Sequence, residues 1–381
     1  MKSVWLWGIL LVGMLCCSSR GSAQGAIRLY NDALNHYLAD EYTQAEERVR
    51  LALKIQKLYP DAWFLLGQCY RKRGQFRKSL KYYRKALKQT PTNAEFRFHK
   101  ALAYEEWGKL KKAVQGYSAT TETDPKYTLA WKRLGAIFFV AGDYRTAIDN
   151  YSEAVDSNPL DEDNFLQRGN AQLALGNLPE AIRDFDLVLA LDAESAEAYF
   201  NRASARFASG DPYAAVKDFS MVIDRRPEDR DAWLNRGISL LALELLPSAR
   251  TDFERALALD SAFADTWWNL AYLLLEQDSV APARIAIQRA TELAPKDAEA
   301  WLLRGRIEFG QRNYVAAIAA YDRCLALDPR YAEAYLNRGE AKRVRGDEKA
   351  ACRDWQKVLK YDAEGGVHAK KADQWIQIVC E

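Results

Sequence analysis

The stretch TLAWKRLGAIFFVAGDYRTAIDNYSEAVDSNPLD, numbered 128–161, holds the pattern that decides the fold. In each half, apolar and small residues recur three or four positions apart, the spacing of one face of an α-helix. Gly142 separates the halves and suits the left-handed position that ends a helix, and Pro159 stops the second half. The stretch therefore predicts two helices packed as a hairpin. The facing residues are Trp131, Leu134, Gly135 and Phe138, then Ala147, Tyr151 and Ala154.

This pattern returns at a constant interval along most of the chain. With the first repeat beginning at residue 26, ten repeats of equal length occupy residues 26–365 without an insertion or a deletion. A fixed period of this length indicates a solenoid, in which each repeat packs only on its neighbours. The glycines that mark the period are Gly74, Gly108, Gly142, Gly176 and Gly210, and the prolines are Pro91, Pro125, Pro159, Pro227, Pro295 and Pro329.

The repeat resembles the tetratricopeptide repeat, a unit of about 34 residues whose signature is Trp-x2-Leu-Gly-x2-aromatic followed by Ala-x3-Tyr-x2-Ala and Pro. The resemblance covers essentially all of the chain after residue 25. It implies an all-α, right-handed superhelical solenoid of antiparallel helix pairs that binds a protein or an extended peptide without a cofactor. The second repeat matches at Trp63, Gly67, Tyr70, Tyr83, Ala86 and Pro91, and the departures from the signature are Leu29, Lys57, Glu244 and Asp278.

Composition excludes several classes of protein. Hydrophobic residues make up 49% of the 381 residues, too large a share for a disordered chain. No stretch after residue 15 lacks charge for the ~18 residues that a membrane-spanning helix needs. The 54 basic and 52 acidic residues nearly balance, so net charge gives no indication of a polyanion-binding protein.

Residues 1–23 have the features of a cleaved signal peptide. A basic residue precedes an uncharged apolar run that is too short to span a bilayer, and small residues follow at the positions that a signal peptidase recognises. The expected location is therefore the periplasm or the extracellular medium. The features are Lys2, the run 4–15, and Gly21 and Ala23 before Gln24.

Cys16 and Cys17 lie where a bacterial lipoprotein would be acylated. The residue before a lipidated cysteine is normally small, whereas here it is Leu15 or Cys16. Lipid anchoring is therefore the minor alternative to cleavage.

Residues 366–381 are predicted to form a capping helix that covers the last repeat, since the end of a solenoid needs an element with a polar outer face. Cys352 begins the second helix of the last repeat and Cys380 ends the capping helix, so antiparallel packing brings the two together. Export to an oxidising compartment then predicts a disulfide between them. Cys69 and Cys324 occupy apolar helix positions and are expected to be core thiols. The covering residues are Ala369, Ala372, Ile376 and Val379.

Nothing in the sequence predicts catalysis or a metal site. His36, His99 and His368 lie far apart in the chain, and a solenoid keeps distant repeats apart. The nucleophile-elbow, phosphate-loop and HExxH motifs are absent. The chain is therefore predicted not to be an enzyme. The alternative is an enzyme subunit that merely contains the solenoid.

The second repeat, residues 60–93, has no acidic residue between Ala62 and Ala94. Such a surface fits an acidic partner protein, an anionic lipid surface or a polyanion, and it equally fits a solvated helix face. Export and the scarcity of aromatic residues that could stack on bases argue against nucleic acid. The basic residues are Arg71, Lys72, Arg73, Arg77, Lys78, Lys81, Arg84, Lys85 and Lys88.

A row of amides is predicted on the inner face of the first helices. A side-chain amide both donates and accepts, so an evenly spaced row can hold a peptide backbone. The row resembles the asparagine ladder of O-linked N-acetylglucosamine transferases, which implies a grip on extended peptides, although amides at this place also simply solvate a groove. The sixth residues of six successive repeats are Gln167, Asn201, Asn235, Asn269, Leu303 and Asn337. The neighbouring positions of the inner face hold Phe200, Phe207, Trp268 and Tyr272.

These features together predict an exported protein-interaction scaffold that binds a peptide or a partner protein in its concave groove. The alternative is a carrier or receptor for envelope lipid or a polyanion that uses the basic second repeat. The carboxylate clamp by which some family members hold chaperone tails is present only as fragments, at Lys132, Arg133 and Asn170.

An ion pair is predicted inside several hairpins, because repeats with Arg as their seventh residue also have Asp as their twenty-third residue. The first repeat holds the reverse, Asp32 and Arg48, and Arg304 opposite Ala320 is the exception. The pairing indicates a partly buried, bidentate contact between the two helices. The pairs are Arg168/Asp184, Arg202/Asp218, Arg236/Asp252 and Arg338/Asp354.

Overall fold

A computed structural model describes residues 23–363 and 366–380. The expected signal peptide lies outside the described residues except for Ala23. All regular secondary structure in the described ranges is helical, as predicted. The chain divides into two compact parts, residues 1–193 and 194–381, which are taken one at a time below.

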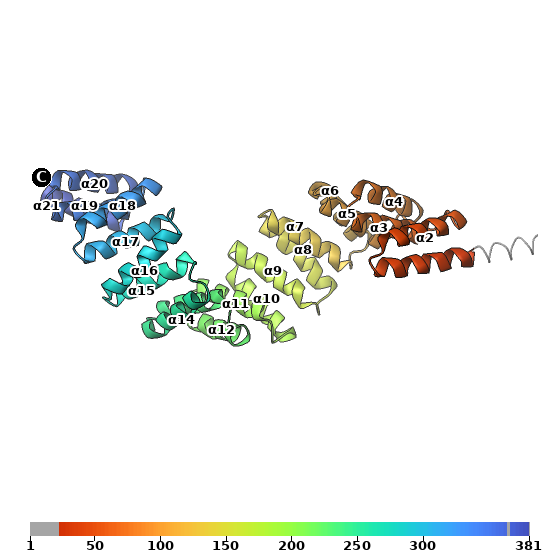
Figure 1. The fold of residues 1–381 in the computed structure, drawn as a ribbon, viewed down its shortest axis with the longest axis horizontal. Helices are drawn as coiled ribbons and strands as arrows, with labels where there is room; N and C mark the ends of the chain where they lie inside the picture. Colours follow the sequence, from red (N-terminus) through yellow and green to blue (C-terminus); the bar gives the residue numbers. More distant parts are fainter. Residues whose placement is uncertain (1–22, 364–365, 381) are drawn as a thin grey trace, which may run out of the picture. The chain divides into compact units, whose positions relative to one another are not determined.

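The N-terminal part stacks antiparallel helix pairs (Figure 1). Residues 23–38 are helical and precede the labelled helices. The helices are α2 (Tyr42–Ile55), α3 (Pro60–Lys72), α4 (Phe76–Gln89), α5 (Ala94–Glu106), α6 (Leu110–Thr123), α7 (Thr128–Val140), α8 (Tyr144–Ser157), α9 (Glu162–Leu175) and α10 (Leu178–Leu191).

The C-terminal part continues the same alternation and ends in the helix that follows the last repeat. Its helices are α11 (Ala196–Ala208), α12 (Pro212–Arg225), α13 (Arg230–Ala242), α14 (Leu246–Leu259), α15 (Ala264–Glu276), α16 (Val280–Leu293), α17 (Ala298–Gly310), α18 (Tyr314–Leu327), α19 (Ala332–Val344), α20 (Glu348–Tyr361) and α21 (Val367–Val379).

In several hairpins the two helices approach closely because a glycine in the first faces an aromatic ring in the second. A Cβ added to Gly237 would lie 2.6 Å from the Phe253 ring. The repeat at 94–127 reverses the arrangement, since Ala101 takes the glycine's place and a Cβ on Gly116 would lie 2.7 Å from its methyl group. One side chain therefore has to be missing at each of these crossings, and the glycine can come from either helix.

First helices end on a residue in the left-handed conformation. Gly142 has φ 78°, and Asp143 then caps α8 by accepting a hydrogen bond from the Thr146 N–H at 3.2 Å. Glu244 and Asp278 adopt the same conformation, with φ 59° and 53°, without being glycine. The turn geometry is therefore kept where the sequence departs from the repeat signature.

The structure confirms the predicted ion pairs. Arg236 donates from Nε and one terminal nitrogen to the two oxygens of Asp252, at 2.7 and 2.8 Å, and Asp252 is only 3% exposed. The remaining nitrogen of Arg236 donates to Ser220 of the preceding repeat at 3.0 Å. Arg304, which lacks an Asp, donates instead to Thr291 at 3.0 Å. The same bidentate contact occurs in Arg168/Asp184, Arg202/Asp218 and Arg338/Asp354.

Helix α21 covers the end of the stack. Ala369 and Ala372 are buried, and Trp375 stacks on the buried ring of Trp355 at 5.8 Å between centroids. Cys352 and Cys380 form a disulfide with their Cα atoms 5.9 Å apart, whereas Cys69 and Cys324 are free and buried. The last repeat is therefore held to its cap both by packing and by a covalent bond.

First helices in the C-terminal part contact one another in succession: α11 with α13, α13 with α15, α15 with α17, and α17 with α19. These helices therefore form one continuous face, on which residues at equal places in successive repeats become neighbours. No helix in the described residues is long and apolar enough to cross a membrane.

Candidate functional site: a groove along the first helices

A cleft of about 510 Å³ opens between α13 and α15. Amides from the predicted row contribute two of its residues, and apolar side chains form its wall. Carboxylates complete the lining, and no Lys or Arg belongs to it. The lining residues are Asp231, Leu234, Asn235, Ile238, Phe263, Asp265, Trp268, Asn269, Asp297 and Glu299.

The amides of Asn235 and Asn269 are held in a fixed orientation by their own helices. Each donates one N–H to the backbone carbonyl one turn earlier, of Asp231 and Asp265 respectively, at 2.8 Å. A carboxamide has two N–H donors and an accepting oxygen, so each side chain keeps one donor and its acceptor for another partner. Two such groups, one repeat apart, can hydrogen-bond to a peptide backbone.

The aromatic residues beside the row differ in their roles. Trp268 lines the cleft and stacks on Tyr272 at 5.6 Å with a 5° interplanar angle. The Trp268 indole N–H is buried and has no hydrogen-bond partner among the described residues. Phe207 is 36% exposed, whereas Phe200 packs edge-on against Phe219 in the core. Trp268 is thus part of the cleft lining and Tyr272 supports it by stacking, while Phe200 mainly stabilises its own hairpin.

Asn337, the last amide of the predicted row, lines a second cleft of about 470 Å³ between α17 and α19. Asn337 and Phe309 line it together with Glu333 and Glu340. Arg306 and Lys371 also line this cleft, so its charges are balanced. Leu303, which interrupts the row, is 3% exposed and belongs to the core.

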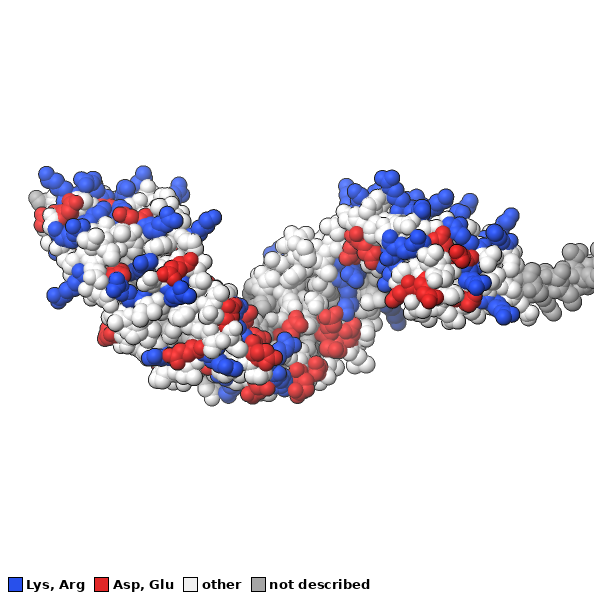
Figure 2. Space-filling model, in the orientation of Figure 1, with Lys and Arg blue, Asp and Glu red and all other residues white. Residues whose placement is uncertain are grey.

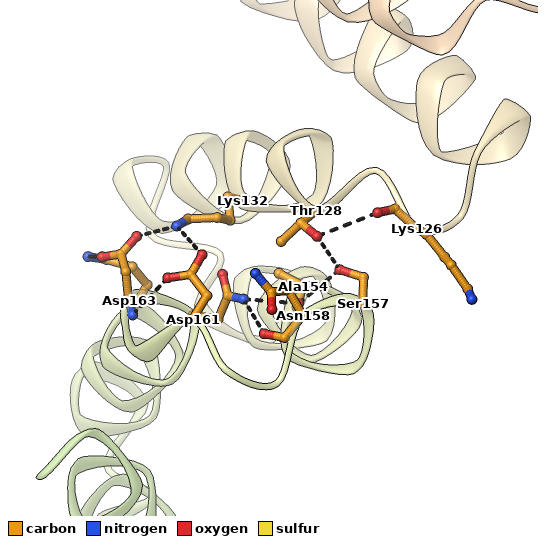
Figure 3. A network of polar contacts seen from close by, with 10 residues as sticks. Lys126, Thr128, Lys132, Ala154, Ser157, Asn158, Asp161 and Asp163 are labelled. Carbon is orange, nitrogen blue, oxygen red and sulfur yellow. Dashed lines mark hydrogen bonds and ion pairs between the residues drawn. The ribbon is translucent and has the colours of Figure 1, made fainter. Parts of the chain in front are cut away.

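In the N-terminal part, Gln167 takes part in a polar network at the start of α9. Gln167 donates to Asp163 at 3.0 Å. Figure 3 shows Lys132 of α7 between Asp161 and Asp163 at the start of α9, at 3.2 and 2.5 Å. Burial alone would lower the pKa of Lys132, and these contacts reverse that effect, so its pKa is raised. Burial would likewise raise the pKa of Asp163, and its hydrogen bonds with Lys132 and Gln167 lower it instead.

The residues that match fragments of the carboxylate clamp already have partners. Lys132 is already bound by two carboxylates, and Arg133 pairs with Glu105 at 3.4 Å. Asn170 also has an interaction partner. A chaperone tail would therefore have to displace existing ion pairs to bind there.

Sequence reasoning did not single out the carboxylates of the cleft. Asp265 and Glu299 are exposed, and they also line the cleft. They occupy the second place of their repeats, one helical turn before the amide row, and this place is acidic in every repeat from residue 162 onward. The period reveals a row of acidic residues, but it does not show which of them line a cleft.

The basic residues of the second repeat form a surface on α4. Figure 2 shows Lys and Arg gathered along the edge of the molecule where α4 lies in Figure 1. Arg71 is the exception, since it is buried and pairs with Glu106 at 2.5 Å, and Arg73 pairs with Glu46 at 2.8 Å. Six exposed cations on α4 have no ion pair among the described residues: Arg77, Lys78, Lys81, Arg84, Lys85 and Lys88.

Other reactive groups are buried. Burial raises the pKa of both the Cys69 and the Cys324 thiol to about 12, which keeps them protonated and unreactive. Burial, together with Arg71, lowers the pKa of His99 to about 4, so its ring is neutral at physiological pH. Among the described residues, no group of three or more His, Cys, Asp and Glu side chains is arranged to hold a metal ion.

Comparison with known proteins shows similarity over parts of the chain. A curated relative, the heat-shock protein cognate co-chaperone sgt12 of Aspergillus fumigatus, is 34% identical over 77 residues, which are 20% of this chain and 23% of the co-chaperone. The match thus spans about a quarter of that protein.

Two solved structures share the fold. A tetratricopeptide repeat protein from Parabacteroides merdae has a TM-score of 0.53 and 19% identity, covering 65% of this chain and 98% of that one. A chain of the APC/C hetero-tetramer Cut9–Hcn1 has a TM-score of 0.51 and 13% identity, covering 93% and 96%.

Models of the tetratricopeptide repeat match residues 60–93 and 82–115 and, in overlapping windows, residues 166–366. The matched ranges hold the hairpins whose glycine–aromatic crossings and left-handed turns are described above. Because they cover more than half of the chain, it belongs to the tetratricopeptide repeat family.

Proposed function

We propose that this chain is an exported, non-catalytic scaffold that holds an extended peptide segment of a partner protein along α11–α19. The observation that carries the proposal is the pair of oriented amides, Asn235 and Asn269, in the cleft between α13 and α15. Family members are protein-interaction modules, which is consistent with this role.

The mechanism is backbone recognition by preorganised groups. The contacts of Asn235 and Asn269 with their own helices fix the two carboxamides before a ligand arrives, so little side-chain entropy is lost on binding. Amides that contact only the peptide backbone accept many sequences, and Trp268 beside them offers apolar contact to a side chain.

The test uses random peptides displayed as a library and selected on the protein without residues 1–23. The triple variant Asn201→Ala, Asn235→Ala, Asn269→Ala should lose roughly 0.5–1.5 kcal/mol of binding free energy per amide for the selected peptides. Asn150→Ala is the matched control, because Asn150 makes the same contact with its own helix, to Thr146 at 2.7 Å, on the second helix α8. Unchanged affinity in a folded triple variant would contradict the proposal.

Export is part of the proposal. The features of residues 1–23 support it, and so does the Cys352–Cys380 disulfide, because structural disulfides persist in oxidising compartments. The exported protein should begin at Gln24 by N-terminal sequencing, and mass analysis without reductant should find two free thiols. Four free thiols, or retention of residues 1–23, would exclude this part.

The unpaired cations on α4 favour a second candidate, binding of an anionic lipid surface or a polyanion. Binding of anionic vesicles through this surface should weaken steeply with salt and be lost in the variant Lys81→Glu, Arg84→Glu, Lys88→Glu. Vesicle binding that is independent of salt and of these residues would rule it out.

A further inference from the structure

The charges of the cleft between α13 and α15 indicate which peptides it takes; this inference rests on the proposed function. Four carboxylates line the cleft, and no Lys or Arg does. Asp231 is bound by the neighbouring Arg230, and Asp297 accepts the Glu299 N–H at the start of α17. Asp265 and Glu299 remain: their side chains are exposed and have no ion pair or hydrogen bond among the described residues.

These two carboxylates lie beside an aromatic wall. Trp268 stacks on Tyr272 and lines the cleft together with Ile238, whereas the ring of Phe263 is already covered by Arg230, 3.5 Å from its centroid. An aromatic face attracts a cation, and apolar surface accommodates the aliphatic stem of Lys or Arg. The cleft therefore combines an apolar wall, amides for a peptide backbone and negative charge for a basic side chain.

We infer that the groove recognises an extended basic peptide, with a Lys or Arg side chain inserted between Trp268, Asp265 and Glu299. The neighbouring cleft at Asn337 lacks this preference, because Arg306 and Lys371 compensate Glu333 and Glu340 there. The charge selectivity is thus concentrated at one point of the groove rather than spread along it.

The spacing of the repeats sets the register of the ligand. Packed helices lie about 8–10 Å apart, and an extended chain advances about 3.3 Å per residue. Consecutive first helices therefore meet about every third residue of the peptide. A suitable probe is a short labelled peptide with Lys at every third position on a Gly–Ala background, compared with the same peptide carrying Ser or Glu at those positions.

Fluorescence anisotropy should show the Lys peptide binding about tenfold more tightly than the Ser peptide, and the Glu peptide more weakly than either. In Asp265→Asn/Glu299→Gln the Lys and Ser peptides should bind alike, and in Asp265→Lys/Glu299→Lys the Glu peptide should bind best. The control Asp224→Asn/Glu292→Gln changes two exposed acids on the second helices α12 and α16 and should keep the preference.

The outcomes separate this inference from the proposed function. If the Lys, Ser and Glu peptides bind equally and their binding depends on Asn235 and Asn269, the groove function stands and the basic preference is wrong. If no peptide binds, or binding ignores the amides, the proposed function fails together with the inference. A Lys preference that survives Asp265→Asn/Glu299→Gln would place the cation elsewhere and also overturn it.

Discussion

Two neighbouring hairpins, α13/α14 and α15/α16, have the same helix crossing but different side chains between their two helices. In α13/α14 a glycine faces an aromatic ring, and an ion pair lies beside them. In α15/α16 the residues at the four corresponding positions of the repeat are all aliphatic and buried. The four places hold Arg236, Gly237, Asp252 and Phe253 in the first hairpin and Leu270, Ala271, Ala286 and Ile287 in the second.

The difference shows that two of the four places, those of the arginine and the aspartate, are coupled. Loss of the arginine goes with loss of the aspartate, whereas an alanine at the glycine's place does not require Ile287, because α11/α12 combines Ala203 with a buried Phe219. The reason is physical, because a buried charge without a partner is costly. The ion pair also has a second role that leucine cannot fill, because Arg236 reaches Ser220 of the preceding repeat.

The largest expected effect comes from breaking the ion pair on one side. Arg236→Leu should destabilise α13/α14 by about 3 kcal/mol or more, because it leaves the Asp252 carboxylate 3% exposed and unpaired. Arg236→Leu/Asp252→Ala, which imitates α15/α16, should cost much less. Hydrogen exchange of the two helices measures both.

The exposed pair of the first repeat is the control for this cycle. Arg48 and Asp32 have 46% and 45% exposed side chains, so Arg48→Leu should change stability by less than about 1 kcal/mol. Equal effects at the two pairs, or a double variant as unstable as the single one, would show that burial does not set the cost.

A smaller effect is expected from filling the crossing. Gly237→Ala places a methyl group 2.6 Å from the Phe253 ring and should cost about 1–3 kcal/mol. Adding Phe253→Ile copies the combination of Ala271 and Ile287 and should recover part of the loss. Gly310→Ala, where the added methyl group meets nothing within 4 Å, is the control and should be neutral or slightly stabilising. Thermal unfolding of the four proteins decides, and a Gly237→Ala variant as stable as the wild type would contradict the close approach.

The smallest effect concerns the turns that both hairpins share. Glu244 and Asp278 both adopt the left-handed conformation, which glycine adopts without steric cost. Glu244→Gly and Asp278→Gly should each stabilise the protein by about 0.5–1 kcal/mol. This is the net effect, in which the relief of the left-handed backbone strain outweighs the larger conformational entropy of glycine in the unfolded chain. Destabilisation at both turns would mean that the two side chains make contacts that outweigh the backbone strain.

The sequence by itself determined the features that depend on one hairpin or on adjacent helices. The constant repeat period, the glycine caps, the Arg–Asp pairs and the placing of Cys352 near Cys380 all follow from helix periodicity and antiparallel packing of adjacent helices. These contacts join places whose separation along the chain is fixed, so a repeated pattern is enough to reveal them.

Only the tertiary structure decided which of the repeated residues meet across neighbouring repeats. It brings Asp265 and Glu299, which hold the same place in adjacent repeats, to one cleft with Trp268. It also binds Lys132 and Gln167 into the network at Asp161 and Asp163. Residues at the same place in two repeats have identical local patterns, so the pattern cannot distinguish a carboxylate in solvent from one in a cleft. That distinction depends on how closely the first helices pack and on which side chains lie between them.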